Sequence, residues 1–118
     1  MKKRIDLKLY KNNKIEQEYY NKTCIENDNN YTFIIDNVTT KISNTNFIRE
    51  TSDYFFNLDI IKKSCLYILK TNNLEFDIEV KKVNYYQNEN KIILDYEINT
   101  DEEPFKIEIN IYEENVHE

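Results

Sequence analysis

The chain has 118 residues, a formal net charge of −6 and 40% hydrophobic residues, which suffices for one domain with a core but not for two. It contains no Gly and one Pro, and the lack of Gly excludes the glycine-rich phosphate loops of nucleotide-binding enzymes. Residues 1–70 carry 12 Lys and Arg against 9 Asp and Glu, whereas residues 71–118 carry 4 against 13. Because "MKKR" is the largest basic cluster, no binding to nucleic acid is predicted.

Apolar and polar residues alternate along most of the chain, which is the pattern of β-strands with one buried face. No window shows the period of an amphipathic helix, so no helix longer than one turn is predicted. Without Gly, the tight turns must use Asn and Asp, and we expect such turns at Asn37 and at Asn72-Asn73. In chain order, the predicted strands are "RIDLKLY", "KIEQEYYNKTC", "YTFIID", "VTTKIS", "NFIRE", "DYFFNLDII", "CLYILKT", "LEFDIEV", "KIILDYEIN" and "FKIEINIYEE".

The segment "NLEFDIEVKKVNYY" changes its phase partway along. Its apolar residues occupy even positions from Leu74 to Val80, and its large residues occupy odd positions from Val83 to Tyr85. The change falls at Lys81-Lys82 and predicts a β-bulge, which bends a long strand. The alternation alone leaves open whether this apolar face encloses a ligand or fills a core.

About ten strands with short connections predict antiparallel neighbours, because parallel neighbours need long crossovers. One flat sheet of that size would expose its edges, so the strands should close into a barrel or split into two packed sheets. Hardly any connection is long enough for a Greek key, which favours the barrel. We therefore expect an all-β fold, an antiparallel up-and-down barrel of about eight to ten strands with little or no helix. A single barrel domain is predicted over residues 1–118, with its core at about 3–113 and a tail at 114–118.

A family resemblance covers roughly residues 42–112. The segments "NFIRETSDYFFNLDI", "CLYILKTNNLEFDIEV" and "KIILDYEI" resemble the YwiB-like proteins of Firmicutes, with an Arg near the middle, a turn after "KT" and a late "DYEI" strand. At that turn the family usually has Gly, where this chain has Asn72-Asn73. The resemblance implies a small cytoplasmic protein with a lipocalin-like, calycin-type barrel. It carries over no activity and no catalytic residue.

Arg49 is one of two arginines in the chain. If Phe47 faces inward, strand alternation turns Arg49 inward as well. Its guanidinium could then pair with the carboxylate of a small amphipathic or acidic ligand. The alternative is an Arg at a strand end that pairs with Glu50, Asp53 or Asp59 and extends into water.

The ten tyrosines supply further candidates for a ligand site. Inward hydroxyls could hold a polar head group, and the tyrosines considered are Tyr19, Tyr31, Tyr54, Tyr67, Tyr85 and Tyr96. Of these, Tyr54, Tyr67 and Tyr96 are the candidates for a site beside Arg49. Alternatively, these tyrosines are simply good strand formers, half-buried with their hydroxyls in water.

Neither catalysis nor a cofactor or metal site is predicted. The only His is His117, so no set of Ser, His and an acid can be assembled.

Cys24 and Cys65 lack the spacing of metal ligands, and we expect free buried thiols in a reducing compartment, with a disulfide between strands as the alternative. No stretch of apolar residues has the length needed to span a membrane, and a soluble cytoplasmic protein is predicted.

The function expected from the sequence is non-enzymatic binding, with a small hydrophobic or carboxylate ligand in the barrel. The alternative is a protein-interaction module whose barrel is filled by its own side chains and whose acidic outer face meets a protein partner. The abundance of large apolar residues and the absence of Ala and Gly favour a narrow interior. A homodimer is compatible with either function.

Overall fold

The computed structural model describes residues 1–98 and 101–114, and these form ten antiparallel strands and no helix. Each strand pairs with the next one along the chain, and the last strand returns to pair with the first. The predicted antiparallel up-and-down barrel is therefore confirmed. The strands are β1 (Lys2–Lys11), β2 (Lys14–Asn27), β3 (Asn30–Ile35), β4 (Val38–Ile42), β5 (Asn46–Glu50), β6 (Tyr54–Asp59), β7 (Ser64–Leu69), β8 (Leu74–Gln87), β9 (Lys91–Ile98) and β10 (Asp101–Glu113).

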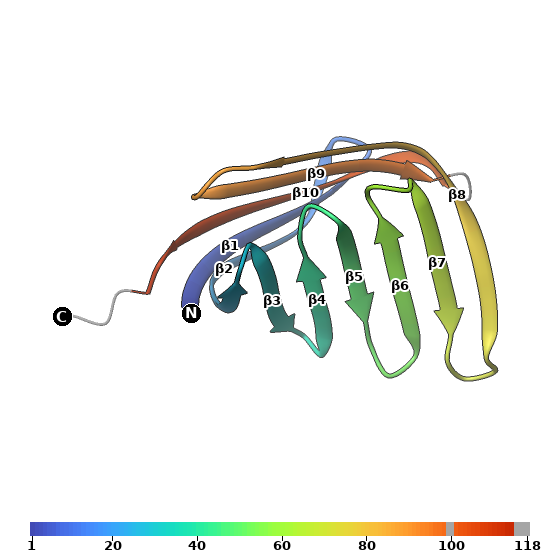
Figure 1. The fold of residues 1–118 in the computed structure, drawn as a ribbon, viewed down its shortest axis with the longest axis horizontal. Coiled ribbons are helices and arrows are strands. Elements are labelled where there is room, and N and C mark those ends of the chain that lie inside the picture. Colours follow the sequence, from blue (N-terminus) through green and yellow to red (C-terminus); the bar gives the residue numbers. More distant parts are fainter. Residues whose placement is uncertain (99–100, 115–118) are drawn as a thin grey trace.

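The strands fall into two groups, short and long. β3 to β7 have 5 or 6 residues each and stand side by side, whereas β1, β9 and β10 run across them (Figure 1). β8 belongs to both groups, because its first half pairs with β7 and its second half pairs with β9. Its pairing with β9 shifts register between Val80 and Lys82, which confirms the predicted bulge at Lys81-Lys82.

The predicted tail, residues 114–118, lies outside the described residues except for Glu114, whose carboxylate is 3.7 Å from the Arg4 guanidinium. Among the described residues, no helix is long and apolar enough to cross a membrane.

Asn and Asp make the two-residue turns, as expected for a chain without Gly. Asn12-Asn13, Asp28-Asn29 and Asp36-Asn37 each connect two neighbouring strands, and both residues of every pair have positive φ. Two consecutive positive φ values are the signature of a type I′ turn, whose twist matches that of the flanking strands. The hairpin predicted around Asn37 is confirmed.

The turn predicted at Asn72-Asn73 is longer than expected. Leu69 pairs with Leu74, so residues 70–73 form a four-residue loop, and within it only Asn73 has positive φ. Lys70 follows the last β7–β8 pair and still contacts the β5–β6 side of the sheet. Its N–H donates to the carbonyl of Asp53 at 2.8 Å, and its ammonium lies 2.7 Å from the carboxylate of Glu50.

Replacing Asn37 by Val is expected to lower the free energy of unfolding by about 1–2 kcal/mol. The φ of Asn37 is 64°, where a β-branched residue pays the steric penalty of the left-handed region. Urea unfolding of the variant measures the loss, and Asn37→Gly is the matched control that should retain full stability. Equal stability of the Val and Gly variants would contradict the turn geometry.

Side chains fill the middle of the barrel. Inward-facing residues from all parts of the sheet form one cluster, and the close packing of such a cluster is the main source of stability. The barrel is thus a packed core at its centre, and any ligand site must lie towards an end. The largest fully buried side chains are Phe47, Ile5, Ile42, Leu58, Ile92, Leu94, Ile109 and Cys24.

Candidate ligand-binding site

The two ends of the barrel differ in chemistry. One end, here called the polar end, opens into a depression of about 660 Å³ whose lining includes Lys3, Glu26, Tyr31, Tyr85 and Gln87. The opposite end, called the aromatic end, has an apolar depression of about 350 Å³. We call the lining of this second depression the aromatic shelf; it consists of Phe56, Tyr67, Phe76, Ile78 and Ile98.

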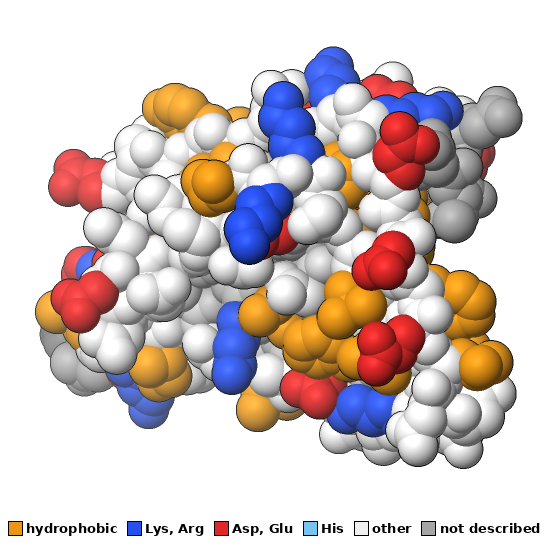
Figure 2. All heavy atoms as spheres, turned by 45° about the vertical axis from the view of Figure 1, so that its right-hand side comes forward, with side chains coloured by type: hydrophobic (Ala, Val, Ile, Leu, Met, Phe, Trp, Pro, Cys, Tyr) orange, Lys and Arg blue, Asp and Glu red, His pale blue; other side chains and the backbone are white. Residues whose placement is uncertain are grey.

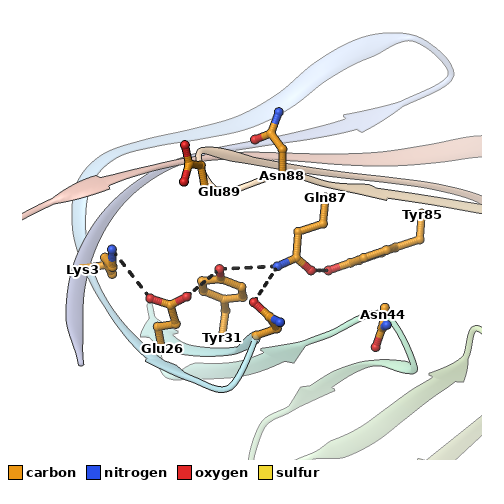
Figure 3. Close-up of a pocket in the computed structure, with 9 residues that line it drawn as sticks. Lys3, Glu26, Tyr31, Asn44, Tyr85, Gln87, Asn88 and Glu89 are labelled. Atoms are coloured by element: carbon orange, nitrogen blue, oxygen red, sulfur yellow. Dashed lines mark hydrogen bonds and ion pairs between the residues drawn. The ribbon is translucent and has the colours of Figure 1, made fainter.

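A chain of hydrogen bonds crosses the polar end (Figure 3). The Tyr31 hydroxyl donates to the Glu26 carboxylate at 3.0 Å, and the Tyr85 hydroxyl donates to the side-chain oxygen Oε1 of Gln87 at 2.6 Å. The Gln87 amide donates in turn to the Asn29 side chain at 3.4 Å. Burial raises the pKa of Tyr31 to about 12, and the hydrogen bond to Glu26 adds to this rise. Burial likewise raises the pKa of Tyr85 to about 12, so both tyrosines keep their protons at neutral pH.

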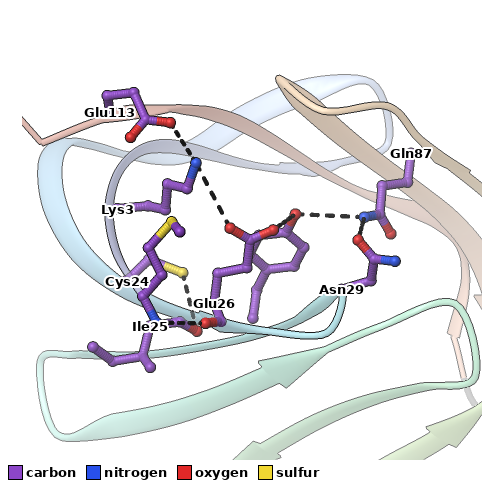
Figure 4. Close-up of polar contacts among 9 residues, drawn as sticks. Lys3, Cys24, Ile25, Glu26, Asn29, Gln87 and Glu113 are labelled. Atoms are coloured by element: carbon purple, nitrogen blue, oxygen red, sulfur yellow. Dashed lines mark hydrogen bonds and ion pairs between the residues drawn. The ribbon is translucent and has the colours of Figure 1, made fainter.

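Charged residues extend this network to the rim of the barrel (Figure 4). The Lys3 ammonium lies 3.7 Å from Glu26 and 2.5 Å from Glu113. The hydrogen-bonding groups of these side chains find their partners within the network. This explains how inward-facing polar groups are accommodated at the polar end. It leaves the opposite end as the better candidate for a ligand.

At the aromatic end, a row of side chains crosses four neighbouring strands. Arg49 of β5 is paired with Phe56 of β6, Phe56 with Tyr67 of β7, and Tyr67 with Phe76 of β8. Directly opposed residues in antiparallel strands face the same side of the sheet. Phe47, two residues before Arg49, is 1% exposed, so this side is the interior. The three aromatic residues of this row, Phe56, Tyr67 and Phe76, are here called the aromatic wall. The row therefore places the positive charge of Arg49 at one end of this wall.

The aromatic wall is open at its β8 end. Phe76 is 45% exposed and Leu74 is 47% exposed, although both share the interior face. The reason is an offset between strands, because β9 begins to pair with β8 only at Val80. The apolar face of the segment "LEFDIEV" therefore fills the core only in part. Its outer part contributes to the aromatic shelf.

Ring contacts join the three candidate tyrosines at this end. Tyr54 stacks on Tyr67 with ring centroids 5.7 Å apart, and Tyr96 contacts Phe56 at 6.3 Å and stacks on Phe105 at 5.2 Å. Burial raises the pKa of Tyr96, and the positive charge of Arg49 opposes this rise. Arg49 thus lies within electrostatic range of Tyr96. The structure brings all four candidate residues, Arg49, Tyr54, Tyr67 and Tyr96, to the same end.

Arg49 has no salt bridge or hydrogen bond with any other residue in the described ranges. The alternative pairing with Glu50, Asp53 or Asp59 is wrong, since none of these described carboxylates forms a salt bridge with Arg49 and Glu50 pairs with Lys70 instead. Arg49 lines a third depression, of about 110 Å³, together with Tyr19 of β2, Thr40 of β4 and the turn residue Asp36. Across this depression the Tyr19 hydroxyl donates to Asp36 at 3.1 Å. The guanidinium is therefore available to an anion that enters the aromatic end.

Two residues of the site were not predicted from the sequence, namely Phe56 and Phe76, whereas Tyr19 is one of the tyrosines considered there. Phe56 shares its strand face with Tyr54, and Phe76 lies on the apolar face noted above, so alternation is a signal that could have found both. What alternation does not reveal is that Phe76 stays exposed, because exposure depends on where the neighbouring strand begins.

The described residues contain no group of three or more His, Cys, Asp or Glu that could hold a metal ion. Cys24 and Cys65 are free and buried, so the alternative of a disulfide between them is wrong. Burial raises the pKa of each thiol to about 11, which keeps both protonated at neutral pH. His117 lies outside the described residues.

Comparison with models of known families, with curated proteins and with solved structures finds no match.

Proposed function

We propose that the protein binds a small amphipathic carboxylic acid at the aromatic end of the barrel. Arg49 pairs with the carboxylate, and the aromatic shelf holds the apolar part of the ligand. The observation that carries this proposal is the inward guanidinium of Arg49, which lacks an anionic partner among the described residues and lies in one row with Phe56, Tyr67 and Phe76.

The two halves of the site contribute by different forces. A hydrogen bond to a charged group contributes about 1.5–3 kcal/mol, and a bidentate pair between Arg and a carboxylate also fixes the orientation of the ligand. Each buried methylene adds about 0.8 kcal/mol. Arg49 and Phe76 are three strand spacings apart, or about 14 Å. A ligand of that length, such as a medium-chain acid, reaches both.

Decanoate is therefore expected to bind, and Arg49→Ala is expected to weaken this binding by about tenfold or more. Isothermal titration calorimetry measures the affinity. Arg4→Ala is the matched control, since it removes the only other arginine, which lies outside the site and contacts Thr23 and Glu114. The Arg4 variant should bind decanoate as the unmodified protein does.

Decanol serves as the second probe, because it has the same chain without the charge. We expect it to bind weakly and to be insensitive to Arg49→Ala. Phe76→Ser, which removes an exposed part of the shelf, should weaken both probes. Equal binding of decanoate and decanol, unchanged by Arg49→Ala, would contradict the proposal.

The proposal includes a cytoplasmic location, where Cys24 and Cys65 stay reduced. It describes a binding protein of the lipocalin-like, YwiB-like kind rather than an enzyme, because a cation and an apolar surface provide recognition but no nucleophile.

A further inference from the structure

Residues 74–78 at the start of β8 have one free edge in the described part of the chain. Residues 74–79 pair with β7 over six consecutive positions without a register shift, from Leu69–Leu74 to Ser64–Glu79. On the other side, pairing with β9 begins at Val80, and no strand in the described part of the chain pairs with residues 74–78. In Figure 1 this segment is the yellow strand at the right-hand margin of the row of short strands. Such a regular, unpaired edge is a template for an added strand.

We propose that this edge binds an extended peptide in which basic and apolar residues alternate, by adding it to the sheet as a further strand. Main-chain hydrogen bonds to the edge supply affinity in this mode of recognition, and alternate side chains supply specificity.

The side chains of the edge define what the added strand must carry. On the interior face, Leu74 and Phe76 are 47% and 45% exposed and offer apolar contacts. On the outer face, Glu75 and Asp77 are exposed, and neither has a salt bridge to another described residue. A strand with apolar residues inward and Lys or Arg outward matches both faces, since opposite charges on neighbouring strands attract. Figure 2, which turns this side forward, shows hydrophobic side chains gathered next to acidic ones.

The same charges argue against a second copy of this chain as the occupant. Two β8 edges that paired with each other would bring the carboxylates of Glu75 and Asp77 close to their own copies, and like charges on paired strands are destabilising. β2 is a less suitable edge, because its pairing with β1 shifts register twice and Asn21 has positive φ. Bulges of this kind disfavour the addition of a strand.

The synthetic peptide acetyl-KLKVKLK-amide tests the proposal, with acetyl-ELEVELE-amide as the acidic counterpart. We expect the basic peptide to bind in fluorescence anisotropy and to slow hydrogen exchange at residues 74–79. The double variant Glu75→Lys, Asp77→Lys should weaken binding by about tenfold or more. Glu16→Lys, Glu18→Lys makes the same change of charge on exposed residues of β2 and should leave binding nearly intact.

Equal loss of binding in both double variants would reduce the effect to net charge and overturn the proposal. Self-pairing would replace the proposal if two results came together. Analytical ultracentrifugation would show that the protein alone forms a dimer, and hydrogen exchange would show that this dimer protects residues 74–79. The result can be separated from the carboxylate site, because Arg49→Ala should leave peptide binding intact and the β8 double variant should still bind decanoate.

Discussion

Replacing Phe47 by Ala is expected to lower the free energy of unfolding by about 3–5 kcal/mol, the usual cost of removing a buried Phe. Phe47 is 1% exposed, and its ring contacts Phe56 at 5.9 Å and Tyr96 at 6.0 Å. The substitution leaves a cavity between the row of short strands and the long strands that cross it. Because Phe56 and Tyr96 also lie at the aromatic end, decanoate binding should weaken as well. Urea unfolding followed by circular dichroism measures the loss of stability.

Phe55→Ala is the matched control, because Phe55 belongs to β6 and is only partly buried, on the outer face of the sheet. We expect it to cost about 1 kcal/mol, since little apolar surface is returned to water. Equal losses for the two variants would contradict the assignment of Phe47 to the packed centre of the barrel.

Much of the fold could be predicted because a barrel of short-looped strands depends on local patterns. The period of two marks each strand, the Asn and Asp pairs mark the turns, and the change of phase at Lys81-Lys82 marks the bulge. Each of these signals lies within a few residues of the feature that it specifies. The loop at 70–73 differs from the expected two-residue turn, because Leu69 pairs with Leu74 and only Asn73 of the Asn pair has positive φ.

The candidate site could be predicted only in part. Alternation tied the orientation of Arg49 to that of Phe47, and the structure turns both inward. Whether Tyr54 and Tyr67 face inward was left open by the sequence, and the register places both on the inner face of their strands. Alternation did not reveal that Phe76 remains exposed, because this follows from the offset between β8 and β9. Whether Arg49 finds a partner depends likewise on side chains that meet it across the barrel. Sequence patterns specify the faces of strands, whereas the offsets between strands determine which parts of those faces stay open.

Arg49→Met is expected to raise the free energy of unfolding by about 1 kcal/mol while it removes decanoate binding. An inward cation without an anionic partner loses hydration on folding and gains no ion pair in return, whereas the Met side chain gains from burial. Retaining such a residue is the usual cost of a binding site. Urea unfolding with and without decanoate measures both effects, since the ligand should stabilise only the unmodified protein.

Arg4→Met provides the contrast, because the Arg4 guanidinium donates to Thr23 at 2.7 Å and lies 3.7 Å from Glu114. Removing these contacts should cost about 0.5 kcal/mol, as expected for exposed polar contacts, and should leave decanoate binding intact. Substitution by Met is thus expected to raise the free energy of unfolding at Arg49 and to lower it at Arg4. If Arg49→Met instead destabilised the protein by more than Arg4→Met does, Arg49 would be a structural residue, and the carboxylate site would lose its main support.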